Sequence, residues 1–280
     1  MKKLTLLLAV LVLTGQALLA SSAPKPKTVH VTTADEFLEA IASNCIIVLD
    51  ADYYDLTAAI QERPDLFMSD DRPISYVDQF DGPELHVNDV QNLTIQVGAT
   101  EGGVSTILID PRYAFVIYFE SCKGITLDGV TFGHTEEGYC DRGVLGFEAC
   151  ENVHIKNCDL FGCGTEGIDV SGCDGFLFEN SKIRDCSYYI MHVSNCSNVH
   201  FVSSQFFRNR EFEQVSISGS DDVSFVNCMF ANNEGPLFNV SSPVALNNCV
   251  ILHLADELGG NVELLEAINC IFEYPFPEVG

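Results

Sequence analysis

Two pairs of titratable side chains, one of an acid with a histidine and one of two acids, stand at wide but similar spacing in the middle of the chain. Asp169 precedes His192, and Glu120 precedes Glu148, by intervals of similar length. A carboxylate beside an imidazole can orient the ring and exchange protons with a substrate. Two neighbouring carboxylates can hold a cation such as Ca²⁺ or divide the roles of acid and base. Either chemistry requires a fold that brings the chain back to the same place after each such interval.

An internal repeat indicates such a fold. The segment VHIKNCDL at residues 153–160 is echoed by VSFVNCMF at residues 223–230, and the same phase recurs at similar intervals along the chain. The other apolar anchors of the repeat are Leu93, Ile125, Phe176, Val199, Val244 and Leu265. Eight of the 12 cysteines stand three residues before or five residues after an anchor. Because stacked side chains at fixed positions point the same way, these cysteines are expected to be free thiols.

The later and shorter intervals between anchors fit two solenoids, the leucine-rich repeat and the parallel β-helix. A leucine-rich repeat would place a helix or an extended turn in the rest of each repeat. Residues 144–148, 167–171, 189–194 and 215–218 instead alternate apolar and polar side chains, as strands do. Gly, Asn, Asp and Ser cluster between these segments, as turns require. The sequence therefore favours an all-β fold, the parallel β-helix.

Counting backwards from each anchor predicts which outward side chains lie in line. Seven residues before the anchors stand Tyr118, Gly146, Asp169, His192 and Ser216, and five residues before them stand Glu120, Glu148, Ser171, Ser194 and Ser218. Adjacent coils of a β-helix lie about 4.8 Å apart. Asp169 is therefore expected close enough to His192 for a hydrogen bond, and Glu120 is expected beside Glu148.

This face is the predicted site. The candidate catalytic residues are Asp169, His192, Glu148 and Arg142, and the candidate Ca²⁺ ligands are Glu120 and Glu148. An insert at residues 133–142 leads into the strand that carries Glu148, so its side chains could wall one side of the face. The candidate substrate-binding residues are Tyr118, His134, Tyr139 and Tyr189. Outward acid and histidine side chains of an acidic protein are also common as plain solvated surface.

Three segments are expected along the chain. Residues 1–23 have a charged start, a short apolar run and small residues at 20–23 for cleavage, as a secretory signal peptide does, so the protein is expected to be secreted or periplasmic. Residues 24–60 are expected to form a cap of one strand and one short helix. Residues 61–280 are expected to form the β-helix, with an outer loop at about 61–85 and a thin aromatic lid at the carboxyl end.

The charge balance excludes some partners. The chain has 280 residues, with 14 Lys and Arg against 40 Asp and Glu, and a formal net charge of −26. Nucleic acids and anionic membranes are bound by basic faces, so neither is an expected partner. The leader is too short and apolar runs elsewhere are too brief for membrane insertion. We expect a monomer.

The coils resemble the right-handed parallel β-helix superfamily of exported proteins. Residues 28–41, TVHVTTADEFLEAI, followed by residues 46–54, look like the amino-terminal cap of its polysaccharide lyases. The resemblance implies a carbohydrate-active protein, a lyase or hydrolase acting on a polysaccharide that contains uronic acid. Pectate lyases of this fold hold Ca²⁺ with carboxylates and use an Arg base, and polygalacturonases use clustered Asp, but neither signature is intact here. The alternative is a non-catalytic surface or periplasmic β-helix that serves as an adhesin, a glycan-binding module or a structural module.

Overall fold

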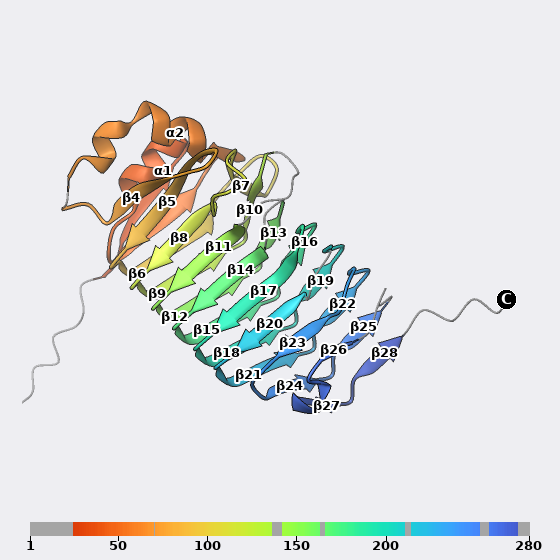
Figure 1. Cartoon of the computed structure of the whole chain (residues 1–280). Coiled ribbons are helices and arrows are strands. Elements are labelled where there is room, and N and C mark those ends of the chain that lie inside the picture. Colours follow the sequence, from red (N-terminus) through yellow and green to blue (C-terminus); the bar gives the residue numbers. More distant parts are fainter. Residues whose placement is uncertain are drawn as a thin grey trace, which may run out of the picture.

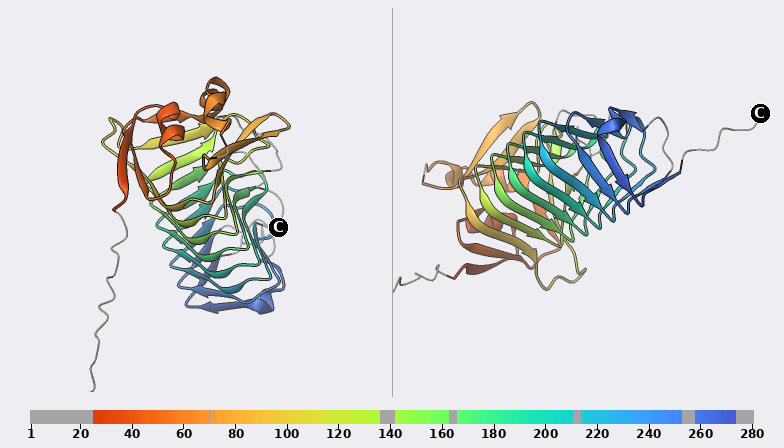
Figure 2. Two further views of the ribbon diagram at one scale, coloured as in Figure 1. Left: turned by 90° about the vertical axis from the view of Figure 1, so that its left-hand side faces the viewer. Right: turned by 90° about the horizontal axis from the view of Figure 1, so that it is seen from below.

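The chain winds into a solenoid whose coils are stacked into three sheets (Figures 1 and 2). The structure, a computed structural model, describes residues 25–69, 71–135, 142–162, 166–210, 214–252 and 258–273. The predicted signal peptide and most of the predicted lid lie outside these residues. In the described part of the chain, strands of successive coils pair in parallel, and no helix is long and apolar enough to cross a membrane. The predicted parallel β-helix is confirmed.

Sheet A carries the apolar anchors of the repeat. Its strands are β1 (Lys27–Val31), β2 (Cys45–Leu49), β6 (Gln91–Val97), β9 (Lys123–Asp128), β12 (Glu151–Lys156), β15 (Asp174–Glu179), β18 (Ser197–Val202), β21 (Asp221–Val226), β24 (Val244–Asn247) and β27 (Leu265–Ile268). Val153, Phe176 and Val199 pair in register on adjacent strands and are buried. The anchors therefore stack in the core, as their constant phase predicts.

Sheet B is made of shorter strands. They are β3 (Tyr53–Asp55), β7 (Ser105–Ile109), β10 (Val130–His134), β13 (Asp159–Phe161), β16 (Lys182–Arg184), β19 (Gln205–Phe207), β22 (Met229–Ala231), β25 (Val250–Leu252) and β28 (Ile271–Glu273). A two-residue turn joins β12 to β13, and its first residue, Asn157, has a φ of +57°. Asn tolerates this left-handed conformation better than most residues do. The same position holds Asn180 and Asn227 in other coils, also with positive φ.

Sheet C forms the third side of the solenoid, and its outer face carries the predicted site. Its strands are β4 (Ile74–Gln79), β5 (Gly82–Asn88), β8 (Ile117–Glu120), β11 (Gly143–Glu148), β14 (Glu166–Ser171), β17 (Tyr189–Ser194), β20 (Val215–Ser218), β23 (Phe238–Val240) and β26 (Gly259–Gly260). Each strand from β5 to β26 pairs in parallel with the next along the solenoid.

The space between the sheets is filled by aliphatic and phenylalanine side chains. Phe201 and Phe225 stack with ring centroids 4.5 Å apart and an interplanar angle of 9°. Phe206 and Phe230 stack beside them at 4.8 Å. Offset ring stacks and buried apolar area both stabilise such a core. Because each coil contacts its two neighbours, this packing continues from coil to coil.

Cysteine thiols stack at the turns between sheets C and A. The ten cysteines within the described residues are free thiols, as predicted, and nine of them are buried. The Sγ of Cys173 accepts the backbone N–H of Cys150, and the Sγ of Cys196 accepts that of Cys173, both at 3.3 Å. The thiols thus satisfy buried backbone donors that no strand pairing uses.

Two helices lie at the amino-terminal end of the solenoid (Figure 1). Helix α1 (Ala34–Ala40) begins after Thr33, whose hydroxyl accepts the Glu36 N–H, and it buries Phe37 and Leu38 against the core. Helix α2 (Leu56–Glu62) begins after Asp55, whose carboxylate accepts the N–H of Ala58.

The segment 61–85, expected as an outer loop, is more ordered than that. It contains a 3-10 helix, η1 (Pro64–Phe67), and the antiparallel hairpin of β4 and β5. A second 3-10 helix, η2 (Val262–Leu264), lies outside this segment, near the carboxyl end of the described residues. Ile74 and Leu85 of the hairpin are buried. The sequence does not predict β4, because β4 is an edge strand whose side chains are mostly exposed. Its residues therefore lack the alternation of apolar and polar side chains that marks a half-buried strand.

Candidate functional site

A line of outward side chains crosses sheet C from coil to coil. Tyr118 pairs in register with Gly146, Gly146 with Asp169, Asp169 with His192, and His192 with Ser216. This is the line that counting from the anchors predicts. Asp169 and His192 are therefore direct neighbours on β14 and β17.

A further acid, Glu166, joins them because the strand alternation slips by one residue. Ile190 and Met191 of β17 are consecutive and both fully buried, and both of their N–H groups donate to the carbonyl oxygen of Gln214. Two successive core-facing residues with this shared acceptor are the pattern of a β-bulge. At the matching place in β14, a Cβ on Gly167 would lie 2.2 Å from Cγ2 of Ile183, so Gly167 also faces the core. Glu166 and Asp169 consequently share the outer face although an odd number of positions separates them.

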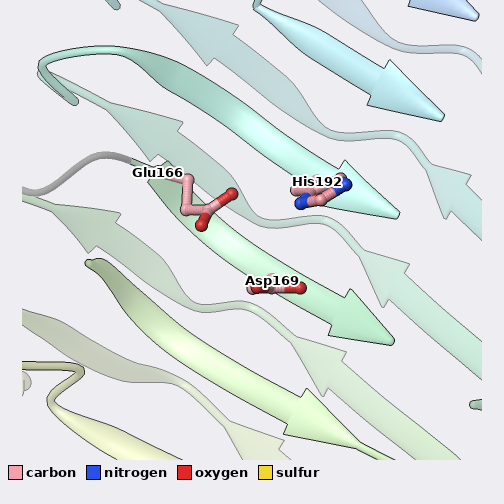
Figure 3. A group of neighbouring side chains, drawn as sticks. All are labelled: Glu166, Asp169 and His192. Atoms are coloured by element: carbon pink, nitrogen blue, oxygen red, sulfur yellow. The ribbon is translucent and has the colours of Figure 1, made fainter. Parts of the chain in front are cut away.

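Glu166, Asp169 and His192 form a compact group, which we call the trio (Figure 3). Their carboxylate oxygens and imidazole nitrogens all lie within 4.8 Å of one another. Figure 3 shows Asp169 and His192 side by side on adjacent strands, with the Glu166 side chain extending towards them. Glu166 is 8% exposed, and the other two are half-buried.

Among the described residues, no hydrogen bond is made by the three side chains of the trio. The expected hydrogen bond between Asp169 and His192 is therefore not formed, although the two residues pair in register and their polar atoms lie within 4.8 Å of each other. Three polar groups face one another without direct contact.

Burial controls the protonation of the two carboxyl groups. The pKa of Glu166 is raised to about 8, chiefly by burial and also by the Asp169 charge, against the lowering effect of the Arg142 guanidinium. Burial also raises the pKa of Asp169, against the lowering effects of His192 and Arg142. A buried carboxyl with few donors favours its neutral form, so Glu166 holds a proton near neutral pH.

Arg142 approaches the trio from the start of β11. Its Nε lies 3.9 Å from Oε2 of Glu84, and its guanidinium lies over the Phe115 ring, 5.5 Å from the centroid. Glu84 is buried and also accepts the Phe115 N–H at 2.7 Å. The guanidinium is thus held by a buried carboxylate and an aromatic ring while remaining half-exposed.

Tyr118 and Glu148 lie on the neighbouring coils. The Tyr118 hydroxyl donates to Oε2 of Glu148 at 2.5 Å, and burial together with this hydrogen bond raises the pKa of Tyr118. A Cβ on Gly146 would lie 2.3 Å from Cδ2 of Tyr118, so a larger residue there would displace the ring. Glu148 pairs in register with Glu120, as predicted, and both are exposed. Ca²⁺ binding by this pair stays a prediction.

The remaining predicted residues are less closely associated with the trio. Tyr189 pairs in register with Glu166 and is half-buried. His134 is 3% exposed, its Nε2 lies 2.9 Å from the Ala114 carbonyl oxygen, and burial lowers its pKa. It therefore offers no open surface to a substrate in this conformation. Tyr139 lies outside the described residues.

Residues 114–262 match the family whose model is described as a right handed beta helix region, and this chain belongs to that family. The solenoid is accordingly a right-handed parallel β-helix. No curated protein matches the sequence.

Three solved structures are similar to the chain at low identity. An alginate lyase from Paenibacillus sp. str. FPU-7 is 8% identical, with 88% of this chain and 97% of that chain covered and a TM-score of 0.43. A pectate lyase from Paenibacillus sp. 0602 is 10% identical, with 80% and 59% covered and a TM-score of 0.41. The pectate lyase Pel9A is 10% identical, with 88% and 78% covered and a TM-score of 0.33.

Proposed function

We propose that the protein is an exported, carbohydrate-active β-helix protein whose sheet C face acts on a polysaccharide containing uronic acid, as a lyase or a hydrolase. The observation that supports it is the trio, which gathers two carboxyl groups and an imidazole within 4.8 Å on an outer face of the solenoid. Long outer faces are where a solenoid can bind an extended polymer. Export and a secreted or periplasmic location rest on the leader-like residues 1–23.

Each residue of the face has a role in this proposal. Cleavage of a sugar polymer needs one group to accept a proton and another to donate one. Glu166 is protonated near neutral pH and donates its proton to the leaving glycosidic oxygen, while Asp169 or His192 accepts the proton that the substrate loses. Arg142 pairs with a carboxylate of the substrate, and the Tyr118–Glu148 pair contacts sugar hydroxyl groups.

The spacing of the two carboxyl groups discriminates between mechanisms. Inverting glycosidases separate their carboxyl groups by about 6.5–9.5 Å to admit a water molecule. Glu166 and Asp169 lie within 4.8 Å, which is too close for that arrangement. The pair is better suited to proton abstraction with elimination, or to a retaining displacement.

A non-catalytic glycan-binding or structural role is the second candidate. It is favoured by the line of short polar side chains that continues beyond His192 through Ser216 to Asn239, which pair in register. Such a surface can contact a polymer without changing it.

The test is a panel of polyuronides and neutral glycans, each incubated with the wild type and with Asp169→Asn, with and without divalent cations. A lyase would release unsaturated products that absorb ultraviolet light, and a hydrolase would release reducing ends alone. Glu179→Gln, on sheet A of the same coils, is the matched control. Cleavage by the wild type and the control but not by Asp169→Asn supports the enzyme. Binding without products supports the second candidate, and neither binding nor cleavage contradicts both.

A further inference from the structure

We propose that Glu166, Asp169 and His192 bind a divalent transition-metal ion, of the class that includes Mn²⁺ and Zn²⁺. This site differs from the predicted Ca²⁺ pair at Glu120 and Glu148 in its residues and in the kind of ion. It stands on the geometry of the trio and does not depend on whether the face acts on polysaccharides.

The distances within the trio suit one central ion. Zinc-type ions hold oxygen and nitrogen ligands at about 2.0–2.2 Å in tetrahedral geometry, so ligand atoms on one ion are roughly 3.3–3.6 Å apart. The ligand atoms of the trio already lie within 4.8 Å of one another. Binding an ion therefore requires side-chain rotations that bring the ligand atoms closer together by up to roughly 1.5 Å. Asp169 and His192 are also paired in register on adjacent strands, so the backbone that carries them is preformed.

The burial of Glu166 is an independent reason to expect a ligand. The side chain is 8% exposed, extends towards the other two, and has no hydrogen-bond partner among the described residues (Figure 3). A buried carboxyl group without a donor is unfavourable. A cation between Glu166, Asp169 and His192 would displace the Glu166 proton into solvent and contact all three side chains together.

Arg142 lowers the pKa of both carboxyl groups of the trio from a distance but does not contact either of them. Within the described residues its ion pair is with Glu84, at 3.9 Å, and no ion pair joins it to Glu166 or Asp169. The net charge of −26 further favours a cation over another acidic partner.

The donor set selects the class of ion. Ca²⁺ prefers six to eight oxygen ligands, and the trio offers two carboxyl groups and a nitrogen. Imidazole suits transition metals such as Zn²⁺ and Ni²⁺, and carboxylates also suit Mn²⁺, so the mixed set favours these ions over Ca²⁺. Three protein ligands also leave coordination positions open for water or a substrate oxygen.

The experiment measures metal binding directly on the full chain, freed of metal by chelation and dialysis. MnCl₂, ZnCl₂ and CaCl₂ are titrated by calorimetry, and bound Mn²⁺ is followed by electron paramagnetic resonance. We expect one equivalent of Mn²⁺ or Zn²⁺ to bind the wild type and to raise its melting temperature. Loss of a ligand in Asp169→Asn or His192→Asn should weaken binding by at least about 10–100-fold, the effect already seen when supporting residues are lost.

Two variants serve as controls. His154 and Glu179 form a half-exposed pair on sheet A, 3.0 Å apart, and no third ligand joins them among the described residues, so His154→Asn should bind the metal as the wild type does. Glu179→Gln, which removes the carboxylate of the same pair, should likewise leave Mn²⁺ binding unchanged. Circular dichroism of each metal-free variant verifies that the fold is retained.

Absence of a Mn²⁺ or Zn²⁺ signal with the wild type would overturn the inference. So would binding that persists undiminished in both folded trio variants, since the ion would then lie elsewhere. Glycan cleavage that continues in excess chelator, without metal binding, would leave the proposed function standing while the metal inference fails. Metal binding without any glycan activity would support the metal inference while the proposed catalytic function fails.

Discussion

The pKa of Glu166 predicts that this one side chain makes stability depend on pH. Its folded-state pKa is about 8, against an ordinary value of 4.5, because the carboxyl is buried beside Asp169. A raised folded-state pKa means that the protonated form favours folding. The contribution is complete below about pH 4.5, is lost as pH rises, and is gone above about pH 8. At about 1.4 kcal/mol per pH unit, the difference amounts to roughly 5 kcal/mol as an upper limit.

The perturbation is Glu166→Gln, which keeps the shape of the protonated acid and does not titrate. Denaturant unfolding of the wild type and the variant is measured from pH 5 to pH 9 in the presence of a chelator, so that metal binding does not contribute. We expect the variant to gain stability relative to the wild type as pH rises, by several kcal/mol in total. The comparison cancels the effect of the net charge, which both chains share except at this residue.

Glu179→Gln is the control, because that side chain lies on sheet A and is 45% exposed, in contrast to the buried Glu166. Its stability difference from the wild type should vary little between pH 5 and pH 9. Parallel stability curves for the wild type and Glu166→Gln would show that the Glu166 carboxyl is solvated and would refute the reasoning.

Three further outcomes follow from the rest of the solenoid. In thiol titration, Cys270 should react in the native protein because it is half-buried, whereas the other nine described thiols are buried and should react only after denaturation. Prompt reaction of several of these nine thiols would contradict the stacked core. Phe225→Ala should lower the free energy of unfolding by about 3–5 kcal/mol, measured by denaturation, because it leaves a cavity within the ring stack; a loss below that of an exposed substitution would count against the packing. Asp185 accepts hydrogen bonds from Arg208 and Arg184, which lower its pKa. Asp185→Asn should therefore lower the free energy of unfolding by at most about 1 kcal/mol at pH 7, and this loss should disappear as pH falls through the folded-state pKa of Asp185. A loss that is independent of pH would point to packing instead.

The pairing of Asp169 with His192 could be predicted because it depends on one property of the chain. The constant interval between the coils here fixes which side chains are neighbours, and the anchors mark that interval in the sequence. Sequence spacing could not reveal that the two side chains would stand apart without a hydrogen bond. That outcome depends on side-chain torsions, which the register of a sheet does not determine.

Glu166 could not be assigned to the same face by alternation. Counting by twos from Asp169 leaves it on the core side, and only the bulge at Gly167 restores it to the surface. The available signal was weak but present: two core-facing residues recur together as Val144 with Leu145 and as Ile190 with Met191. A doublet of apolar residues at one position of successive repeats is the mark of such a bulge.

Because the solenoid is built coil by coil, local unfolding at its carboxyl end can occur while the geometry of the trio is retained. The three side chains span only β14 and β17, so their geometry depends on a single junction between coils. At the carboxyl end, Ile268 and Ile271 are each 59% exposed, and local opening is easiest where apolar contacts are few. Opening from that end must first separate β26, β23 and β20 before it reaches β17. Three strands of sheet C therefore separate the trio from that end, and local unfolding or proteolysis that starts there does not reach the trio until the coils of those strands have opened.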